Sequence, residues 1–146
     1  MKRKLLISAC LIGIGCRYDG GRVKKIDVEA LKDKFELIPV CPEIYGGLPT
    51  PRTPSERVGD RTVMKDGRDV TENFRRGAEE TLSIAESLGV ELALLKEKSP
   101  SCGKGRIYDG SFSGTLTDGN GVTVDLLTSK GIKVYGESEI DELLGD

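Results

Sequence analysis

Residues 40–52 of the chain read VCPEIYGGLPTPR, with a cysteine at the point where an apolar run ends and a loop rich in glycine and proline begins. The preceding residues 36–40 (ELIPV) are short, apolar and partly β-branched, which favours a buried strand over a helix. Cys41 would then follow the carboxyl end of that strand. Pro42 stiffens the exit, while Gly46 and Gly47 permit positive φ or a close approach. Such a loop fits a functional site or a plain turn equally well.

The same arrangement of strand and cysteine occurs twice more. Residues 4–9 (KLLISA) form an apolar segment that leads into Cys10. Residues 91–96 (ELALLK) form another, and the segment 99–103 (SPSCG) with Cys102 follows it. Three cysteines therefore follow three predicted strands.

Helical patterns separate these strands. We expect a helix over 27–35 with Asp27 as its cap, and a longer one from an N-cap at Thr71 to a stop at Gly89. The buried stripe of the longer helix is expected at Phe74, Ala78, Thr81, Leu82, Ala85 and Leu88. A third helix over 122–130, a strand over 132–135 and a short helix opening at Ser138 follow. Alternation of strands and helices predicts an α/β fold, a single domain over 1–146 with a Rossmann-like parallel sheet of about four strands and helices on both faces.

Two polar stretches lie outside this alternation. Residues 57–69 carry the turns Gly59-Asp60 and Asp66-Gly67, and we expect this polar segment to wrap the surface. Residues 105–113 have an Asp-Gly pair between short apolar runs, which indicates a β-hairpin.

The predicted sheet has a consequence for the cysteines. In doubly wound sheets the first strand commonly lies between the next two, and ligands bind beyond the carboxyl ends of the strands. Neighbouring strands lie about 4.8 Å apart, so Cys10, Cys41 and Cys102 are expected within roughly 10 Å of one another. The three thiols can therefore converge on one centre.

Composition excludes several kinds of chemistry. The chain of 146 residues has no histidine, which removes Ser-His-Asp triads, Cys-His pairs and histidine-containing metal sites. Its formal net charge of −2 gives no bulk positive field for nucleic acid, so a nucleic-acid partner is unlikely on charge. The start MKRK leads into a strand with no cleavage site, and no apolar run is long enough to span a bilayer. We expect a soluble cytoplasmic protein with no membrane partner, either a monomer or a weak homodimer.

The four cysteines suggest thiols, metal binding or catalysis more than a disulfide framework. Free cysteine often does no more than pack in a core, which is the simplest interpretation of Cys16 alone. Structural zinc usually brings paired CxxC motifs, and none is present. An iron–sulfur cluster usually takes four cysteines, so three ligands would leave one iron open to a soft substrate sulfur.

Motifs spread over almost the whole chain resemble the small bacterial family that includes the thiouracil desulfurases, long known as a domain of unknown function. They are residues 8–13 (SACLIG), 17–20 (RYDG), 41–43 (CPE), 46–52 (GGLPTPR), 67–71 (GRDVT), 99–103 (SPSCG) and 108–114 (YDGSFSG). The resemblance implies a [4Fe-4S] cluster on Cys10, Cys41 and Cys102, and a small-molecule thiolated base such as 2-thiouracil as substrate. The fourth iron would bind the substrate sulfur, which is removed without net redox chemistry. Cys16 falls outside this set and is the rival fourth ligand.

Candidate catalytic groups lie beside the cysteines. Glu43, two residues after Cys41, is the candidate base or acid, and the resemblance points the same way. Ser101, next to Cys102, is the candidate hydrogen-bond donor to substrate or intermediate. The loop residues Ser8, Asp19, Arg52 and Ser99 are candidates for substrate binding.

Two other functions remain open from the sequence. One is a metal-binding or cluster-carrier protein. The other is a thiol-based sulfur-transfer enzyme with Cys102 as its nucleophile. The groups expected to lower the pKa of Cys102 are Ser101, Gly103 and the nearby Lys98, Lys104 and Arg106. An RNA substrate would depend on Arg52, Arg57, Arg61 and Arg106 as phosphate contacts.

Overall fold

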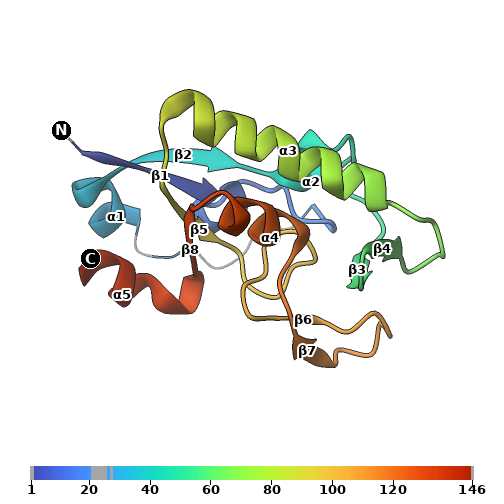
Figure 1. Ribbon diagram of the computed structural model, residues 1–146. Helices are drawn as coiled ribbons and strands as arrows, with labels where there is room; N and C mark the ends of the chain where they lie inside the picture. The colour runs from blue at the N-terminus through green and yellow to red at the C-terminus, as the bar shows by residue number, and fades with distance from the viewer. Residues whose placement is uncertain (1, 21–25, 27, 146) are drawn as a thin grey trace.

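A four-stranded parallel sheet forms the centre of the protein (Figure 1). The computed structural model describes residues 2–20, 26 and 28–145. The strands are β1 (Arg3–Ser8), β2 (Phe35–Val40), β5 (Leu92–Leu95) and β8 (Lys133–Gly136), in the order β2-β1-β5-β8. The first strand lies between β2 and β5, as expected for a doubly wound sheet, and the predicted α/β fold is confirmed.

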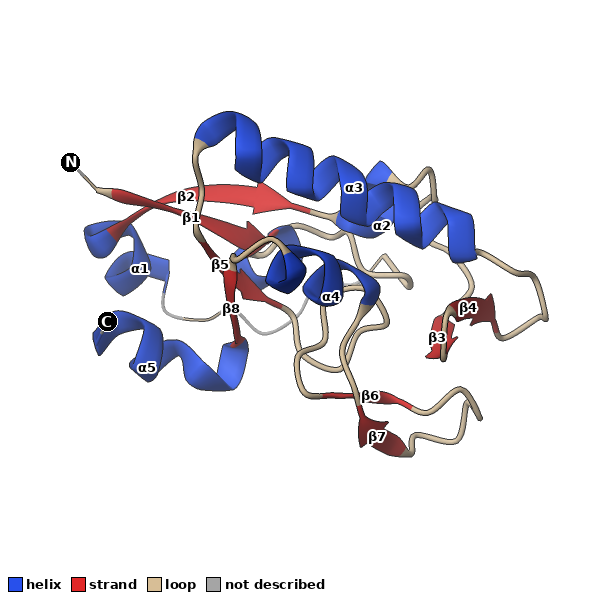
Figure 2. Cartoon of the chain, in the orientation of Figure 1, coloured by secondary structure: helices blue, strands red, loops and turns tan. Residues whose placement is uncertain are grey.

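Helices cover both faces of this sheet (Figure 2). The helices α1 (Val28–Lys34) and α5 (Ile140–Gly145) pack on one face, and α3 (Thr71–Leu88) and α4 (Val122–Ser129) pack on the other. Successive side chains of a strand point to opposite faces. Leu5 and Ile7 of β1 accordingly join the first layer, and Leu6 joins the second. Because both faces are covered, the central strand β5 is apolar and buried along its whole length.

The longest helix differs from its prediction in its cap residue and in the last residue of its buried stripe. Val70 occupies the cap position and Thr71 is the first helical residue, whose N–H donates to Asp69 Oδ1 at 2.9 Å. Gly89 ends the helix with φ of +68°, as predicted. Leu88 is 44% exposed and not part of the buried stripe. The stripe ends at Ala85 because Val90, whose N–H donates to the Ala85 carbonyl, fills the next buried place.

The two short helices are also shifted from their expected bounds. The first covers 28–34, its expected cap at Asp27 lies outside the described residues, and Phe35 begins β2 as a buried side chain. Near the carboxyl end, a 3₁₀ turn η2 (Glu137–Glu139) precedes α5. Ser138 lies inside this turn because its N–H and hydroxyl both donate to the Glu97 carboxylate.

Two β-hairpins lie beside the sheet, at the lower right of Figure 1. The first pairs β3 (Ser55–Val58) with β4 (Arg61–Met64), a hairpin that was not predicted from the sequence of the polar segment 57–69. Four pairs of residues join its two strands around the predicted turn at Gly59-Asp60. The second hairpin pairs β6 (Arg106–Tyr108) with β7 (Leu116–Asp118), as predicted, but a longer loop over 109–115 replaces a tight Asp-Gly turn.

Two short elements follow the first two strands of the sheet. The 3₁₀ turn η1 (Ala9–Ile12) follows β1, and α2 (Pro42–Tyr45) follows β2. The cis peptide bond among the described residues is Thr50–Pro51, so the Cys41–Pro42 bond is trans. In the described part of the chain, no helix has the length and apolar character needed to cross a membrane.

Candidate active site

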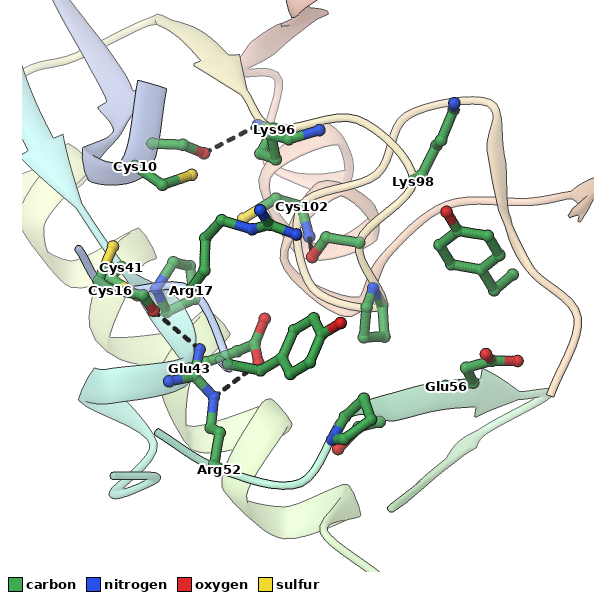
Figure 3. Close-up of a pocket in the computed structure, with 18 of the residues that line it drawn as sticks. Cys10, Cys16, Arg17, Cys41, Glu43, Arg52, Glu56, Lys96, Lys98 and Cys102 are labelled. Atoms are coloured by element: carbon green, nitrogen blue, oxygen red, sulfur yellow. Dashed lines mark hydrogen bonds and ion pairs between the residues drawn. The ribbon is translucent and has the colours of Figure 1, made fainter. Parts of the chain in front are cut away.

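A cavity of about 510 Å³ opens at the carboxyl ends of β1, β2 and β5. The loops that follow these strands form one side of it, and the two hairpins contribute to its far side. Cys10, Cys16, Cys41 and Cys102 all line this cavity (Figure 3). The three cysteines predicted to converge therefore do so at the expected edge of the sheet.

Cys10 is placed by the tight turn that follows β1. It lies in η1, a single 3₁₀ turn that ends at Gly13, where φ is +95°. The Gly13 N–H donates to the Cys10 carbonyl at 3.2 Å and closes the turn. Cys10 is 9% exposed, so its thiol is presented at the cavity from a nearly buried position.

Cys41 is placed by direct contact between two backbones. It is the cap residue of α2, and Pro42 begins that helix. A Cβ on Gly77 of α3 would lie 1.9 Å from the Pro42 carbonyl oxygen, and one on Gly46 would lie 2.0 Å from the Asn73 carbonyl oxygen. Only glycine permits such an approach at these two positions. The packing of α2 against α3 therefore fixes the segment that carries Cys41.

Cys102 is placed by a serine turn joined to α4. The Ser99 hydroxyl oxygen accepts the N–H groups of Ser101 and Cys102, both at 3.0 Å. At the start of α4, the Val122 N–H donates to the Pro100 carbonyl and the Thr123 N–H to the Ser101 carbonyl, each at 2.9 Å. The turn therefore satisfies helical N–H groups that would otherwise lack a partner.

The surroundings of Cys102 and Cys41 raise the pKa of both thiols. Burial raises the pKa of Cys102 to about 12, with the nearby Glu43 carboxylate as a further cause, while hydrogen bonds from Ser8 and Ser101 act in the opposite direction. The pKa of Cys41 is also raised, chiefly by its hydrogen bond with Cys16 and then by burial. A nucleophilic thiol needs a lowered pKa, so the expectation that Lys98, Lys104 and Arg106 activate Cys102 is wrong. Lys104 is instead paired with Glu139 at 2.9 Å.

Cys16 lies among the other cysteines and not in a separate part of the core. It is 5% exposed and hydrogen-bonds through its side chain to both Cys10 and Cys41. The bond with Cys10 is the main cause of its raised pKa. The sequence alone suggests that Cys16 only packs in the core. The structure shows more, because its thiol lies close to Cys10 and Cys41, two of the three expected ligands.

Glu43 and Arg52 form a buried ion pair at the cavity. Arg52 Nε donates to Glu43 Oε1 at 3.1 Å, and the two side chains are 3% and 19% exposed for Arg52 and Glu43 respectively. Arg52 also donates to the carbonyls of Cys16 and Pro49 and to the Thr50 hydroxyl, each at 3.0 Å. Burial raises the pKa of Glu43, and the charge and hydrogen bond of Arg52 oppose that rise. Arg52 therefore holds the carboxylate in a fixed direction.

The four remaining candidates take different places. Ser8 and Ser99 line the cavity, whereas Ser101 and Asp19 are not among the lining residues. Ser101 is 1% exposed, and its hydroxyl lies 2.8 Å from Thr123 Oγ1 and hydrogen-bonds to Cys102. The Ser8 hydroxyl accepts the Lys96 N–H at 2.9 Å and also bonds to Cys102. Both serines therefore contact a cysteine more directly than the open cavity.

The four cysteines bring sulfur donors to the cavity in a chain without histidine. Among residues 2–20, 26 and 28–145, no three Cys, Asp or Glu side chains are close enough to hold one metal ion. Four sulfur atoms without a histidine suit soft metals, and an iron–sulfur cluster is held by such thiolates.

Several lining residues were not predicted as site residues. They come from the loop after η1, from the hairpins and from the segment after β5, and they are Tyr18, Glu56, Lys65, Lys96, Lys98, Tyr108 and Phe112. The motif 108–114 carried the family resemblance without a role for its side chains. Its place on the cavity depends on how the hairpins fold back, which periodicity does not reveal.

Comparison with known proteins gives this cavity a context. The sequence matches the 2-thiouracil desulfurase family over residues 5–139. The chain belongs to that family. A relative, the uncharacterized protein YbbK of Bacillus subtilis (strain 168), is 40% identical over 150 residues, 96% of this chain and 99% of YbbK. A solved structure, the [4Fe-4S]-dependent thiouracil desulfidase TudS, superposes with a TM-score of 0.92 at 46% identity, covering 97% of this chain and 95% of that one. The predicted family membership is confirmed.

Proposed function

We propose that this protein removes sulfur from a thiolated pyrimidine such as 2-thiouracil, with a [4Fe-4S] cluster as its cofactor. The observation that carries the proposal is the meeting of Cys10, Cys41 and Cys102 with a buried Glu43 in one cavity. Membership of the 2-thiouracil desulfurase family and the 46% identity to a [4Fe-4S]-dependent thiouracil desulfidase support it.

Cys10, Cys41 and Cys102 would hold the cluster as thiolates. Each comes from the end of a different strand, and together they leave one iron without a protein ligand. When bound, the cluster supplies a Lewis-acidic iron that attracts a soft sulfur and weakens its bond to carbon. The raised pKa values of Cys41 and Cys102 favour their thiol forms, so cluster assembly would release the protons of these two groups.

Glu43 would act as the base for water. In the overall reaction the water oxygen forms a bond to the ring carbon, the carbon–sulfur bond breaks, and sulfur leaves as sulfide that takes up the protons of water. No net oxidation or reduction occurs. A carboxylate with a raised pKa is suited to take a proton from water and return it to the departing group. Arg52 would keep the Glu43 carboxylate directed into the cavity. Its effect on the substrate would therefore be indirect, through the position of Glu43.

The serines would act on the cysteine side of the cavity. Ser8 and Ser101 would donate hydrogen bonds to the Cys102 sulfur, and such bonds tune an iron–sulfur centre. Ser99 would keep the Cys102 loop in shape through its two backbone bonds. Asp19 is exposed next to the cavity-lining Tyr18, where it would contact only a substrate that extends out of the cavity.

A small substrate agrees with the pairing of the arginines. Arg57 is paired with Asp125, Arg61 with Asp69 and Arg106 with Asp118, at 2.7, 2.9 and 3.8 Å. Arg52 is buried against Glu43. All four arginines considered as phosphate contacts thus have a carboxylate partner, which favours a free base over RNA.

The test is to purify the protein without oxygen, load it with iron and sulfide, and measure iron content and absorbance near 400 nm. We expect about four irons per chain in the wild type. Cys10→Ala, Cys41→Ala and Cys102→Ala should lose the cluster, whereas Cys16→Ala should keep it. Sulfide release from 2-thiouracil is then measured for the loaded protein.

Each outcome separates the proposal from its alternatives. A protein that holds no cluster contradicts it. A protein that holds the cluster but releases no sulfide from thiolated pyrimidines is a cluster-binding or carrier protein. Loss of the cluster in Cys16→Ala would make Cys16 a fourth ligand and would remove the open iron.

A further inference from the structure

The far wall of the cavity contains a bulky residue in a strained backbone conformation. Among the described residues, two that are not glycine have positive φ, Lys98 at 72° and Phe112 at 56°. Both line the cavity. Such conformations cost about 1–2 kcal/mol for ordinary residues, so they persist only where the surrounding structure holds them. Their occurrence in this cavity suggests that the position of each side chain matters to function.

Glu56 holds the backbone around Phe112. Its Oε1 atom accepts the Gly110 N–H at 2.9 Å and the Phe112 N–H at 3.1 Å. Glu56 belongs to β3 in the other hairpin and is 8% exposed, unusually buried for a glutamate. One carboxylate oxygen thus joins the two hairpins and fixes the loop that carries Phe112. In Figure 3, Glu56 lies across the pocket from the labelled cysteines.

The loop is also pressed closely against β3. Gly110 has φ of +95°, and a Cβ there would lie 2.2 Å from Val58 Cγ2. Glycine at this position therefore allows both the backbone shape and the close contact. Gly110, the strained Phe112 and the buried Glu56 carboxylate therefore act together to hold the loop in one conformation.

The cavity offers aromatic side chains to a flat ring. Tyr18, Tyr108 and Phe112 line it, whereas Phe35, Phe74 and Tyr135 are buried in the core. Packing of a nucleobase on an aromatic side chain contributes about 1–3 kcal/mol. Of the three lining residues, only Phe112 has the strained backbone and the buried carboxylate that holds it.

We propose that Phe112 is the surface against which the pyrimidine ring of the substrate packs, and that Glu56 is a positioning residue that holds Phe112 in place. This inference rests on the proposed function and adds to it the part of the site that recognises the ring. Phe112 selects flat aromatic substrates, while the cysteine side of the cavity receives the sulfur.

The experiment uses cluster-loaded protein and measures two quantities. One is KM and kcat for 2-thiouracil by sulfide release, and the other is the dissociation constant of uracil by calorimetry. Phe112→Leu keeps an apolar side chain but removes the ring, and we expect KM and the uracil dissociation constant to rise about tenfold with little change in kcat. Glu56→Ala should give the same pattern. Cluster absorbance should stay at the wild-type value in both.

Two further variants separate positioning from general damage. Glu56→Gln keeps the acceptor oxygen for both N–H groups and should bring KM back toward the wild-type value. Ser113→Ala changes the same loop at an exposed hydroxyl that contacts Thr115 and does not line the cavity, and it should leave both quantities unchanged.

The outcomes for this inference and for the proposed function are distinguishable. Wild-type uracil affinity in Phe112→Leu, or a wild type that does not bind uracil, overturns the inference. A fall in kcat with unchanged KM in Glu56→Ala also overturns the positioning role. A loaded wild type that binds uracil but releases no sulfide counts against the proposed function alone.

Discussion

The two sides of the cavity are held together in different ways. On the cysteine side, backbone meets backbone, at Gly46 and Gly77 between α2 and α3 and at Gly121 beside the Ser101 carbonyl. On the far side, the Glu56 side chain joins the two hairpins through hydrogen bonds to the loop over 109–115, and Gly110 of that loop lies close to Val58 of β3. Contact between backbones fixes the positions of the cysteine loops. Contact through a side chain can be altered by substitution of that one residue. The comparison teaches that the chemistry is placed on the rigid elements and ring recognition on the adjustable ones.

The sharpest way to separate the two sides is to remove the charge on the cysteine side. Glu43→Gln keeps the size of the side chain and an acceptor for Arg52 but removes the base. We expect kcat for 2-thiouracil to fall about 10²–10⁴-fold, with iron content unchanged. Sulfide release under saturating substrate measures the effect.

The matched control is Glu36→Gln, the same change on an exposed residue of β2 outside the cavity. Its activity should equal that of the wild type. Full activity in Glu43→Gln would show that water is activated by another group.

Backbone contact on the cysteine side can be broken with one methyl group. Gly77→Ala places a Cβ 1.9 Å from the Pro42 carbonyl oxygen, so α2 must move away from α3. We expect the free energy of unfolding to fall by about 1–3 kcal/mol, as for other overpacked cores. Iron uptake should fall with it, because Cys41 moves with α2. Thermal unfolding and iron analysis measure both effects.

The control lies in the first hairpin. Gly59→Ala places a Cβ with nothing within 4 Å, at a residue with φ of +60°. Only the backbone cost of about 1–2 kcal/mol is expected, with no loss of iron uptake. Equal iron uptake in Gly77→Ala and Gly59→Ala would contradict the difference between the two regions.

Stability should respond to pH in opposite directions on the two sides. On the cysteine side, burial raises the pKa of Cys102 from 9.0 to about 12. The fold therefore favours the neutral thiol, and this contribution is complete below pH 9 and is lost as the pH rises toward 12. The melting temperature of cluster-free protein should fall over this range, and Cys102→Ala should reduce that dependence.

On the hairpin side, Asp69 gives the opposite response. Hydrogen bonds from Thr71, and then Arg61, lower the pKa of Asp69 from 3.8 to about 2. The fold favours the carboxylate, so this contribution is present above pH 4 and is lost as the pH falls toward 2. Melting curves between pH 2 and 5 should flatten slightly in Asp69→Asn, the smallest effect expected here. If the melting temperature of Asp69→Asn depends on pH as in the wild type, Asp69 does not contribute to acid sensitivity.

The order of strands and the meeting of three cysteines could be predicted because they follow from local patterns. Apolar runs identify the strands, and the rule for doubly wound sheets places Cys10, Cys41 and Cys102 at one edge. Glu43 could be proposed because it follows Cys41 directly. Each of these inferences needs only the position of a residue relative to the end of a strand.

The far wall could not be predicted for a physical reason. Glu56 looks like an ordinary strand residue in a polar segment, and its role depends on Gly110, more than fifty residues later in the chain. The same holds for Cys16, whose contacts with Cys10 and Cys41 arise from how its loop folds back. Long-range contacts of polar side chains leave no periodic signal in the sequence.

The hydrogen bonds between the 99–103 turn and the start of α4 determine when, during synthesis of the chain, the cysteine site can be completed. Cys10 and Cys41 emerge early from the ribosome, but the turn with Cys102 is complete only when Gly121, Val122 and Thr123 have joined it. At roughly 5–20 residues per second, several seconds of synthesis separate the first cysteine from the finished site. With Cys10, Cys41 and Cys102 as the proposed ligands, insertion of the cluster would follow synthesis of most of the chain.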